Sequence, residues 1–215
     1  MNKLKLQDLT VEMSSELTVF PGDPAFEKQV IVKLDDKNNH YCLSKISLSN
    51  HLGTHIDFPA HVMRGGKTSS DYSHDDLQGD GLIIEVPSEH RSINLNFLKE
   101  YSFFQNDIIF FKTNNSNLSK TGNFSDHAVY IEPEAAEFLV ESKVKIVGID
   151  YLSVDQYSAI ELPVHHILLS NNILIIENLD LKNTTQGRYQ FLIIPSFKIA
   201  GMDGLQVRVF VVNNI

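Results

Sequence analysis

The sequence predicts an α/β fold in a single domain, with a mixed, barrel-like β core flanked by a few helices. Three observations support this prediction. The chain has 215 residues, which suits one sizeable domain better than two small ones, and we assign 1–215 to that domain. Many short runs are rich in Val, Ile and Phe, and only two or three segments carry signals that start a helix.

The strands are predicted from short apolar runs bounded by polar residues. The runs in DIIFFK and ILIIE are continuously apolar, which is typical of strands buried on both faces. The predicted strands span residues 29–33, 41–48, 82–86, 108–112, 145–149, 173–177, 191–195 and 207–212.

The helices are predicted from proline and acidic residues at their starts. A helix is predicted over residues 133–142, in the segment EPEAAEFLVES, whose first glutamate precedes the helix. Pro133 takes the first helical position, and acidic groups lie near the positive end of the helix dipole. A second helix is expected over 163–170, with His165 and His166 in its first turn, and a short third one near 94–100.

Composition and charge exclude several classes of function. The net charge of −9 argues against a nucleic-acid surface, which is normally basic, and provides no polybasic patch for an anionic membrane. No apolar run is long enough to cross a membrane as a helix. The single cysteine, Cys42, cannot form an intramolecular disulfide, and the N-terminal segment has no apolar signal region, so we expect a cytoplasmic protein.

The stretch NHLGTHIDFPAH, residues 50–61, gathers three histidines and an aspartate around a glycine and a proline. Because proline is disfavoured inside helices and central strands, we expect an irregular segment or a short helical turn followed by an extended piece. Imidazole and carboxylate groups together suit borderline divalent ions such as zinc or manganese. A single histidine is more often a surface or capping group, but this cluster favours a metal or catalytic site.

A second cluster lies in VHHILLSNNILIIENLDL. His165 begins a predicted helix and Glu177 ends an apolar strand, so both side chains are candidates to complete the first cluster. His166 points about 100° away around the helix, so only one of the two adjacent histidines is expected to be a ligand. The alternative for Glu177 is a strand end that simply meets water.

With these residues in view, the sequence resembles the cyclase-like metal-dependent hydrolase family, which includes kynurenine formamidases and isatin hydrolases. HLGTHIDFPAH is similar to the signature H-x-G-T-H-x-D-x-P-x-H of that family. Four more segments resemble it in the same order: the PGDP turn at 21–24, the Gly-Gly segment from 65, the block EPEAAEFLVESKVKIVGIDYLSVD, and HHILLSNNILIIENLDL. The resemblance implies a swivelling β/β/α type of fold.

The resemblance also implies a role for each site residue. His61 would be the catalytic acid and base, and Asp57 would bridge two metal positions. His165 is preferred over His166 because the family histidine lies twelve residues before its glutamate. The implied metal ligands, for one or two Zn²⁺ or Mn²⁺ ions, are His51, His55 and Asp57 for the first position and Asp57, His165 and Glu177 for the second.

The implied activity is hydrolysis of an amide, with N-formylkynurenine, an intermediate of tryptophan breakdown, as the leading substrate. Phe20 is a candidate to bind the aromatic substrate, and Phe58 is another; core packing is the alternative for both. Many relatives have tryptophan where this chain has Phe20, and this chain has no tryptophan. Ser153 and Asp155 would either support the site or form a structural turn.

Two other functions stay open at this point. One is hydrolysis of a cyclic amide such as isatin, or of another substrate of the family. The other is binding of a metal or ligand without catalysis, which the extra base His61 disfavours. The resemblance further implies a homo-oligomer, a dimer or tetramer.

Overall fold

The computed structural model describes residues 5–35, 39–118 and 124–213. Strands outnumber helices among them. The strands are β1 (Lys5–Asp8), β2 (Glu27–Val32), β3 (Leu43–Ser47), β4 (His55–Asp57), β5 (Gln78–Glu85), β6 (Ser92–Ile93), β7 (Ile108–Lys112), β8 (Tyr130–Ile131), β9 (Ile146–Ile149), β10 (Leu174–Glu177), β11 (Gly187–Pro195) and β12 (Gly204–Asn213). The helices are α1 (Leu95–Leu98), α2 (Pro133–Glu141) and α3 (Pro163–Ser170), with four 3-10 turns, η1 to η4.

The main sheet closes on itself. Its strand order is β1-β12-β11-β5-β7-β9-β10-β4, and β4 also pairs with β12, so every strand except β1 belongs to a ring. Strands β5, β7, β9 and β10 run parallel, while β4, β11 and β12 are antiparallel to their neighbours. The predicted α/β fold with a mixed, barrel-like core is therefore confirmed.

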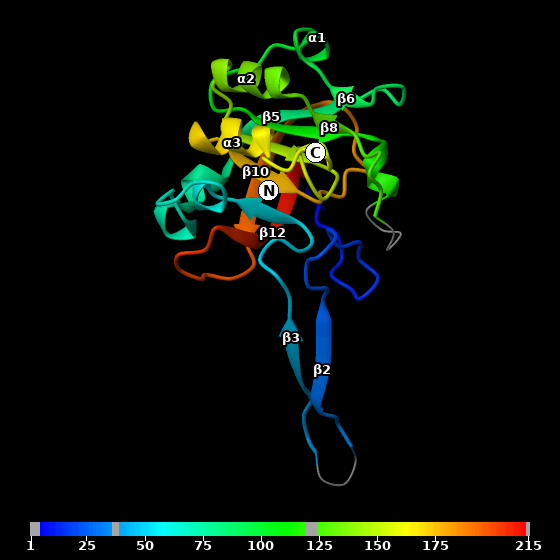
Figure 1. Cartoon of the computed structure of the whole chain (residues 1–215). Helices are drawn as coiled ribbons and strands as arrows, with labels where there is room; N and C mark the ends of the chain where they lie inside the picture. The colour runs from blue at the N-terminus through cyan, green and yellow to red at the C-terminus, as the bar shows by residue number, and fades with distance from the viewer. Residues whose placement is uncertain (1–4, 36–38, 119–123, 214–215) are drawn as a thin grey trace.

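Strand β7 explains why the parallel strands are apolar throughout. Its alternate residues Ile108 and Phe110 belong to the core inside the ring, while Ile109 and Phe111 belong to a second core outside it. The outer core includes buried residues of α2 and α3, which cover this side of the sheet (Figure 1). A strand with apolar neighbours on both faces needs no polar alternation.

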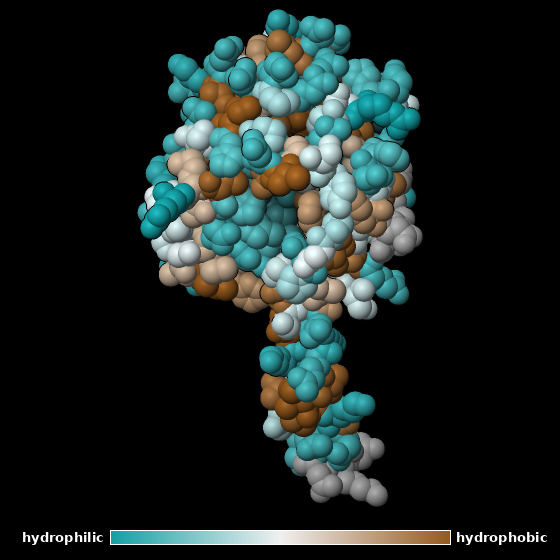
Figure 2. All heavy atoms as spheres, in the orientation of Figure 1, coloured by the Kyte–Doolittle hydropathy of each residue, from teal (hydrophilic) through white to brown (hydrophobic). Residues whose placement is uncertain are grey.

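A two-stranded ribbon formed by β2 and β3 projects from the body (Figure 1). Nearly all residues of its two strands are exposed, although they include several large apolar side chains that are about half exposed. Figure 2 shows these as a hydrophobic patch on the projection. The exposed apolar residues of this ribbon and its loop are Val30, Ile31, Leu34, Tyr41, Leu43 and Ile46.

The predicted elements are recovered with shifted ends. Helix α3 has the predicted bounds, α2 ends one residue early, and α1 is a single turn capped by the Asn94 side chain. The sequence reading missed β1, the short strands β6 and β8, and β4. Among the described residues no helix is long and apolar enough to cross a membrane. The assignment of 1–215 to one domain stays a prediction.

Residues 50–61 differ from the prediction. We expected an irregular segment or a short helical turn followed by an extended piece, but the order is reversed: His55–Asp57 form strand β4 in the middle of the sheet, and Pro59–His61 form a 3-10 turn after it. Proline does not prevent this because Pro59 follows the strand and begins the turn. The partners of β4 on both sides are distant in sequence, so local pattern gave no sign of the strand.

Gly81 provides a test of the closed sheet. It lies opposite Ile108 in the β5–β7 register, and a Cβ atom at 81 would collide with the Ile108 backbone. Gly81→Ala is expected to lower the free energy of unfolding by about 2 kcal/mol or more, because backbone cannot move as a side chain can. Urea unfolding followed by circular dichroism measures this change.

Gly187→Ala is the matched control, because Gly187 lies in the neighbouring strand and a Cβ there meets only the Tyr189 ring at ordinary distance, 3.5 Å. Equal midpoints for the two variants would contradict the close approach of β5 and β7.

Candidate metal centre

Strand β4 carries the centre of the site. In a strand, alternate side chains point to opposite faces. Ile56 therefore packs in the core inside the ring, while His55 and Asp57 share the other face. Strand β4 is inserted between β10 and β12, so both polar side chains are buried, at 2% and 0% exposure.

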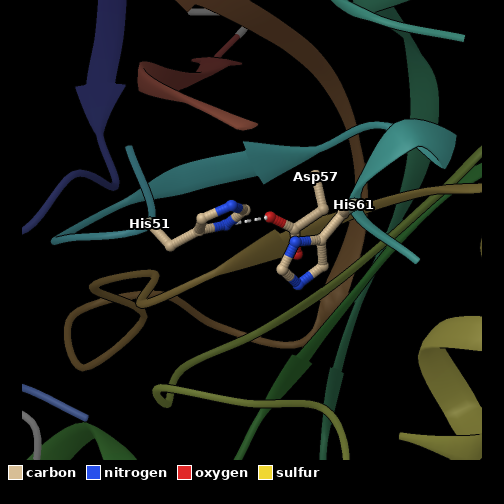
Figure 3. Close-up of side chains that lie close together, drawn as sticks. All are labelled: His51, Asp57 and His61. Atoms are coloured by element: carbon tan, nitrogen blue, oxygen red, sulfur yellow. Dashed lines mark hydrogen bonds and ion pairs between the residues drawn. The ribbon is translucent and has the colours of Figure 1, made fainter. Parts of the chain in front are cut away.

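The chain turns on both sides of β4 and brings two more histidines to this face. Gly53 adopts φ +71°, a conformation that favours glycine, and precedes the strand. The turn η1 (Pro59–His61) follows the strand and returns His61 to His51, with 4.2 Å between the ring centroids. Figure 3 shows His51, Asp57 and His61 pointing toward one another, with Nδ1 of His51 2.8 Å from Oδ1 of Asp57.

His165 and Glu177 complete the cluster from distant parts of the chain. His165 is buried in the first turn of α3, while its neighbour His166 is exposed. Glu177 ends β10 directly opposite His55. Nε2 of His165 lies 3.2 Å from Oε1 of Glu177, and Nε2 of His55 lies 3.5 Å from Oε2.

Outer contacts fix the orientation of the two buried rings. His55 donates its Nδ1 proton to the backbone oxygen of Gly53 at 2.8 Å. His165 Nδ1 donates to Oδ2 of Asp155 at 2.6 Å, and the other oxygen of Asp155 accepts from the Val164 backbone at the start of α3. Each ring therefore directs Nε2 at the carboxylates, as metal-binding histidines do when a second group holds the other nitrogen.

Ser153 also has a defined contact, since its hydroxyl accepts from the Asp155 backbone N–H at 3.1 Å. The backbone N–H of Val154 donates to Oε1 of Glu177 at 2.8 Å. Asp155 therefore contacts His165 and the Val154 backbone contacts Glu177, whereas Ser153 forms a turn within the block.

Burial and charge act against each other in this cluster. Burial alone would lower the pKa of His55, but the Asp57 carboxylate raises it to about 10. Burial would also lower the pKa of His165, and the charge of Glu177 instead raises that pKa well above its usual value. Burial would raise the pKa of Asp57, whereas the charge on His55 holds it well below the ordinary range. The two buried carboxylates, Asp57 and Glu177, are therefore stabilised as anions by positive charge beside them.

His61 differs from these rings. Burial is the main cause that lowers its pKa, and the neighbouring His51 and His165 charges act in the same direction against the attraction of Asp57. It is also more exposed, at 25% of its side chain. A ring with a lowered pKa is neutral at neutral pH and can accept a proton.

The donor set fits a divalent cation. Oδ2 of Asp57 is buried without a hydrogen-bond partner, and it lies 3.6 Å from Nε2 of His165. Several nitrogen–oxygen separations here exceed a good hydrogen bond of about 2.7–3.2 Å. Imidazole nitrogens and carboxylate oxygens are ligands of zinc and manganese, and a cation would supply the charge that protons on His55 and His165 otherwise provide.

Among the described residues, two groups of three have donor atoms within 4.8 Å of one another. One is His51, Asp57 and His61, and the other is His55, Asp57 and Glu177. Asp57 belongs to both, which agrees with a bridging position. The grouping differs from the division implied by the family resemblance, in which His61 moves protons and binds no metal, so the individual roles stay predictions.

A cavity of about 250 Å³ opens onto these groups. In Figure 2 it corresponds to a hollow with hydrophilic residues inside and hydrophobic ones on its rim. Phe20 lines it together with all of the predicted histidines and Glu177. Phe58, the other aromatic candidate, is 1% exposed and stacks on Tyr72 at 5.2 Å between centroids, so it belongs to the core.

The sequence reading missed Asp203, whose Oδ2 lies 3.1 Å from Nε2 of His51 and 3.5 Å from Nδ1 of His61. The only local signal is the segment GMDG just before a hydrophobic strand. Nothing in that segment relates it to residues 50–61, because the pairing of β12 with β4 brings them together.

Comparison with known proteins agrees with this geometry. Residues 7–156 match the family described as putative cyclase. The chain is 31% identical to a kynurenine formamidase of Salinibacter ruber over 205 residues, which covers 95% of this chain and 96% of that protein. It is 29% identical to a kynurenine formamidase of Bacillus anthracis over 97% of each chain.

Solved structures share the fold. A potential metal-dependent hydrolase with cyclase activity superposes with a TM-score of 0.86 at 26% identity, covering 99% of this chain and all of that one. Isatin hydrolase A of Labrenzia aggregata superposes with a TM-score of 0.83, covering 97% and 93% of the two chains. Its identity of 18% shows a shared fold alone.

The two adjacent histidines provide a test of the site. His165→Ala is expected to weaken zinc binding by more than the roughly 10–100-fold typical for loss of an outer partner, because it removes a buried donor that faces Glu177. His166→Ala is the matched control, because His166 is exposed on the same helix turn. Competition with a chromogenic chelator measures both affinities, with melting temperature as the check on folding. Equal affinities would exclude His165 as a ligand.

Proposed function

The chain belongs to the putative cyclase family, and we propose that it is a metal-dependent amide hydrolase that cleaves N-formylkynurenine to kynurenine and formate. The observation that carries the proposal is a cluster of four histidines and two carboxylates at a cavity, in which both carboxylates, His55 and His165 are buried while His51 and His61 are partly exposed. The kynurenine formamidases support the substrate, since their similarity extends over nearly the whole chain.

The proposed metal is Zn²⁺ or Mn²⁺, as one ion or two. His51, His55 and Asp57 would hold the first ion, and His165, Glu177 and the second oxygen of Asp57 would hold the other. A divalent ion bound there supplies Lewis-acid polarisation of the amide carbonyl and activation of water. The unpartnered Oδ2 of Asp57 supports a shared position for this carboxylate.

His61 is the proposed acid and base. It stands at the cavity with a lowered pKa, so its neutral ring takes a proton from the attacking water. The imidazolium then gives this proton to the leaving nitrogen as the carbon–nitrogen bond breaks. The leaving aryl amine is a weak base, so its protonation is less demanding than that of an alkyl amine.

An aromatic wall supports an aryl substrate. Phe20 packs against Phe124 and Tyr157, with 5.9 Å between ring centroids in both pairs. Its ring also lines the cavity beside the histidines. Offset or edge contacts with such rings would position an aromatic amide.

Two related assays decide between substrates. We expect formate release from N-formylkynurenine by the zinc- or manganese-loaded protein. Ring opening of isatin without formate release would favour the cyclic-amide alternative, and a loaded protein without either activity would leave only metal binding.

His61→Ala is expected to lower kcat on N-formylkynurenine by about 100-fold or more, since general acid–base groups typically contribute 10²–10⁴-fold. Its metal content, measured by atomic emission, should stay at the wild-type value. His74→Ala, outside the cavity on the 3-10 turn η3 (His74–Leu77), is the control for loss of a histidine. Full activity of His61→Ala would refute its role as proton carrier.

We also propose that the protein is a homo-oligomer and works in the cytoplasm. The lone Cys42 is exposed and free, which suits a reducing compartment. The ribbon of β2 and β3 supports self-association, because an isolated two-stranded sheet is marginally stable in water and this one exposes Val30 and Ile46.

Ile46→Asp tests the ribbon. The register places Ile46 opposite Lys28 and on the same face as Val30, whereas Gln29 lies on the other face. Wild type is expected to sediment as a dimer or tetramer, and Ile46→Asp as a smaller species, because a charge in place of the apolar Ile46 side chain opposes its burial. The control Gln29→Asp is expected to sediment as wild type, because Gln29 is already polar. A monomeric wild type in analytical ultracentrifugation would contradict the proposal.

A further inference from the structure

We propose that Asp203 is a positioning residue that holds both His51 and His61 through one carboxylate; this inference rests on the proposed function of the site. Oδ2 of Asp203 faces Nε2 of His51 at 3.1 Å and Nδ1 of His61 at 3.5 Å. A single oxygen thus lies between a proposed metal ligand and the proposed proton carrier.

Asp203 is itself held on its other sides. Its Oδ1 accepts a hydrogen bond from Nδ2 of Asn50 at 2.9 Å, and its backbone oxygen accepts from the backbone N–H of Phe58, also at 2.9 Å. Both contacts connect it to the segment that carries the histidines. The carboxylate is therefore fixed relative to the two rings, even though its side chain is 42% exposed.

For His51, the carboxylate selects which nitrogen carries a proton. Nδ1 faces Oδ1 of Asp57 at 2.8 Å, and Nε2 faces Asp203. When Nε2 donates its proton to Asp203, Nδ1 carries no proton. Its lone pair then points toward Asp57, on the side where the other proposed metal ligands lie. A carboxylate on the outer nitrogen in this way both orients a ligand ring and raises its basicity.

For His61, the same carboxylate orients the imidazole ring. Because Nδ1 faces Asp203 at 3.5 Å, Nε2 is the atom left to accept a proton from water and return it to the leaving group. Hydrolases that use a histidine base commonly orient it through a third group of this kind. The ring also packs over His51, which limits its rotation.

Gly204 provides an independent sign that this segment is shaped around His51. A Cβ atom at 204 would lie 2.9 Å from Nδ1 of His51 and closer still to Cε1. Gly204 pairs with Asp57 in the β4–β12 register, so the backbone beside Asp203 passes directly along the site. Only a residue without a side chain allows the ring this approach.

The carboxylate of Asp203 faces Nε2 of His51, while Nδ1 of that ring faces Asp57. The contacts of Asp203 are with the outer nitrogen of His51 and with His61, so it acts through these rings. The alternative is direct ligation of the cation, which would change the number of ions bound.

Asp203→Asn tests the proposal, because it keeps the size and an oxygen for Asn50 but removes the charge. In the zinc-loaded protein we expect kcat on N-formylkynurenine to fall about 10–100-fold, as for other outer partners of metal-site histidines, with KM little changed. Zinc affinity in chelator competition should fall about 10-fold, with the number of ions at saturation unchanged. Glu137→Gln, exposed on α2, is the control for loss of a carboxylate.

Three results would overturn the proposal. Unchanged kcat and zinc affinity in Asp203→Asn would show that the contacts do not position the rings. Loss of a whole equivalent of zinc at saturation would make Asp203 a ligand. The third result concerns folding. If the metal-free variant melts at a lower temperature than metal-free wild type, and this loss of stability accounts for the loss of zinc affinity, the role of Asp203 is structural. If wild type fails to hydrolyse N-formylkynurenine, the proposed function fails, while zinc affinity still tests Asp203 independently.

Discussion

The buried carboxylate of Asp57 is the constraint on which the site depends. Strand β4 places it between β10 and β12 with no exposed surface, and an isolated ionised group there would be very costly. The surrounding rings of His51, His55 and His165 offset this cost with protons, and a divalent cation would do so in their place. The histidines that lower the cost of burying the Asp57 charge are thus also candidate metal ligands.

The closed sheet gives this cluster its rigidity. Donors come from β4, from the end of β10, from the first turn of α3 and from the turns flanking β4. Backbone groups hold His55 and Glu177, and the Asp155 carboxylate holds His165. Preorganised donors suit catalysis because they need little rearrangement when charge develops on the substrate. His61 is the exception, since it lies on a short 3-10 turn at the cavity and is partly exposed, a position that suits the proposed transfer of a proton between water and the leaving group.

Much of the fold was predictable from local pattern. The runs IIFFK and ILIIE gave β7 and β10 because apolar neighbours on both faces leave a continuous apolar trace in the sequence, and proline marked the starts of α2 and α3. Strand β4 was not predictable, since it has three residues and its partners lie more than a hundred positions away. Nor was Asp203, which has no metal-site pattern around it and reaches His51 only because β12 pairs with β4.

The sequence by itself determined which residues are candidates: His51, His55, Asp57, His61, His165 and Glu177 could be singled out because metal and proton chemistry require these residue types. The tertiary structure decided how they are used. It put Phe20 at the cavity and Phe58 in the core, buried His165 while exposing His166, and brought Asp203 against two rings. These outcomes depend on closing a sheet from distant strands, and the free energy of that closure comes from long-range packing that local sequence does not encode.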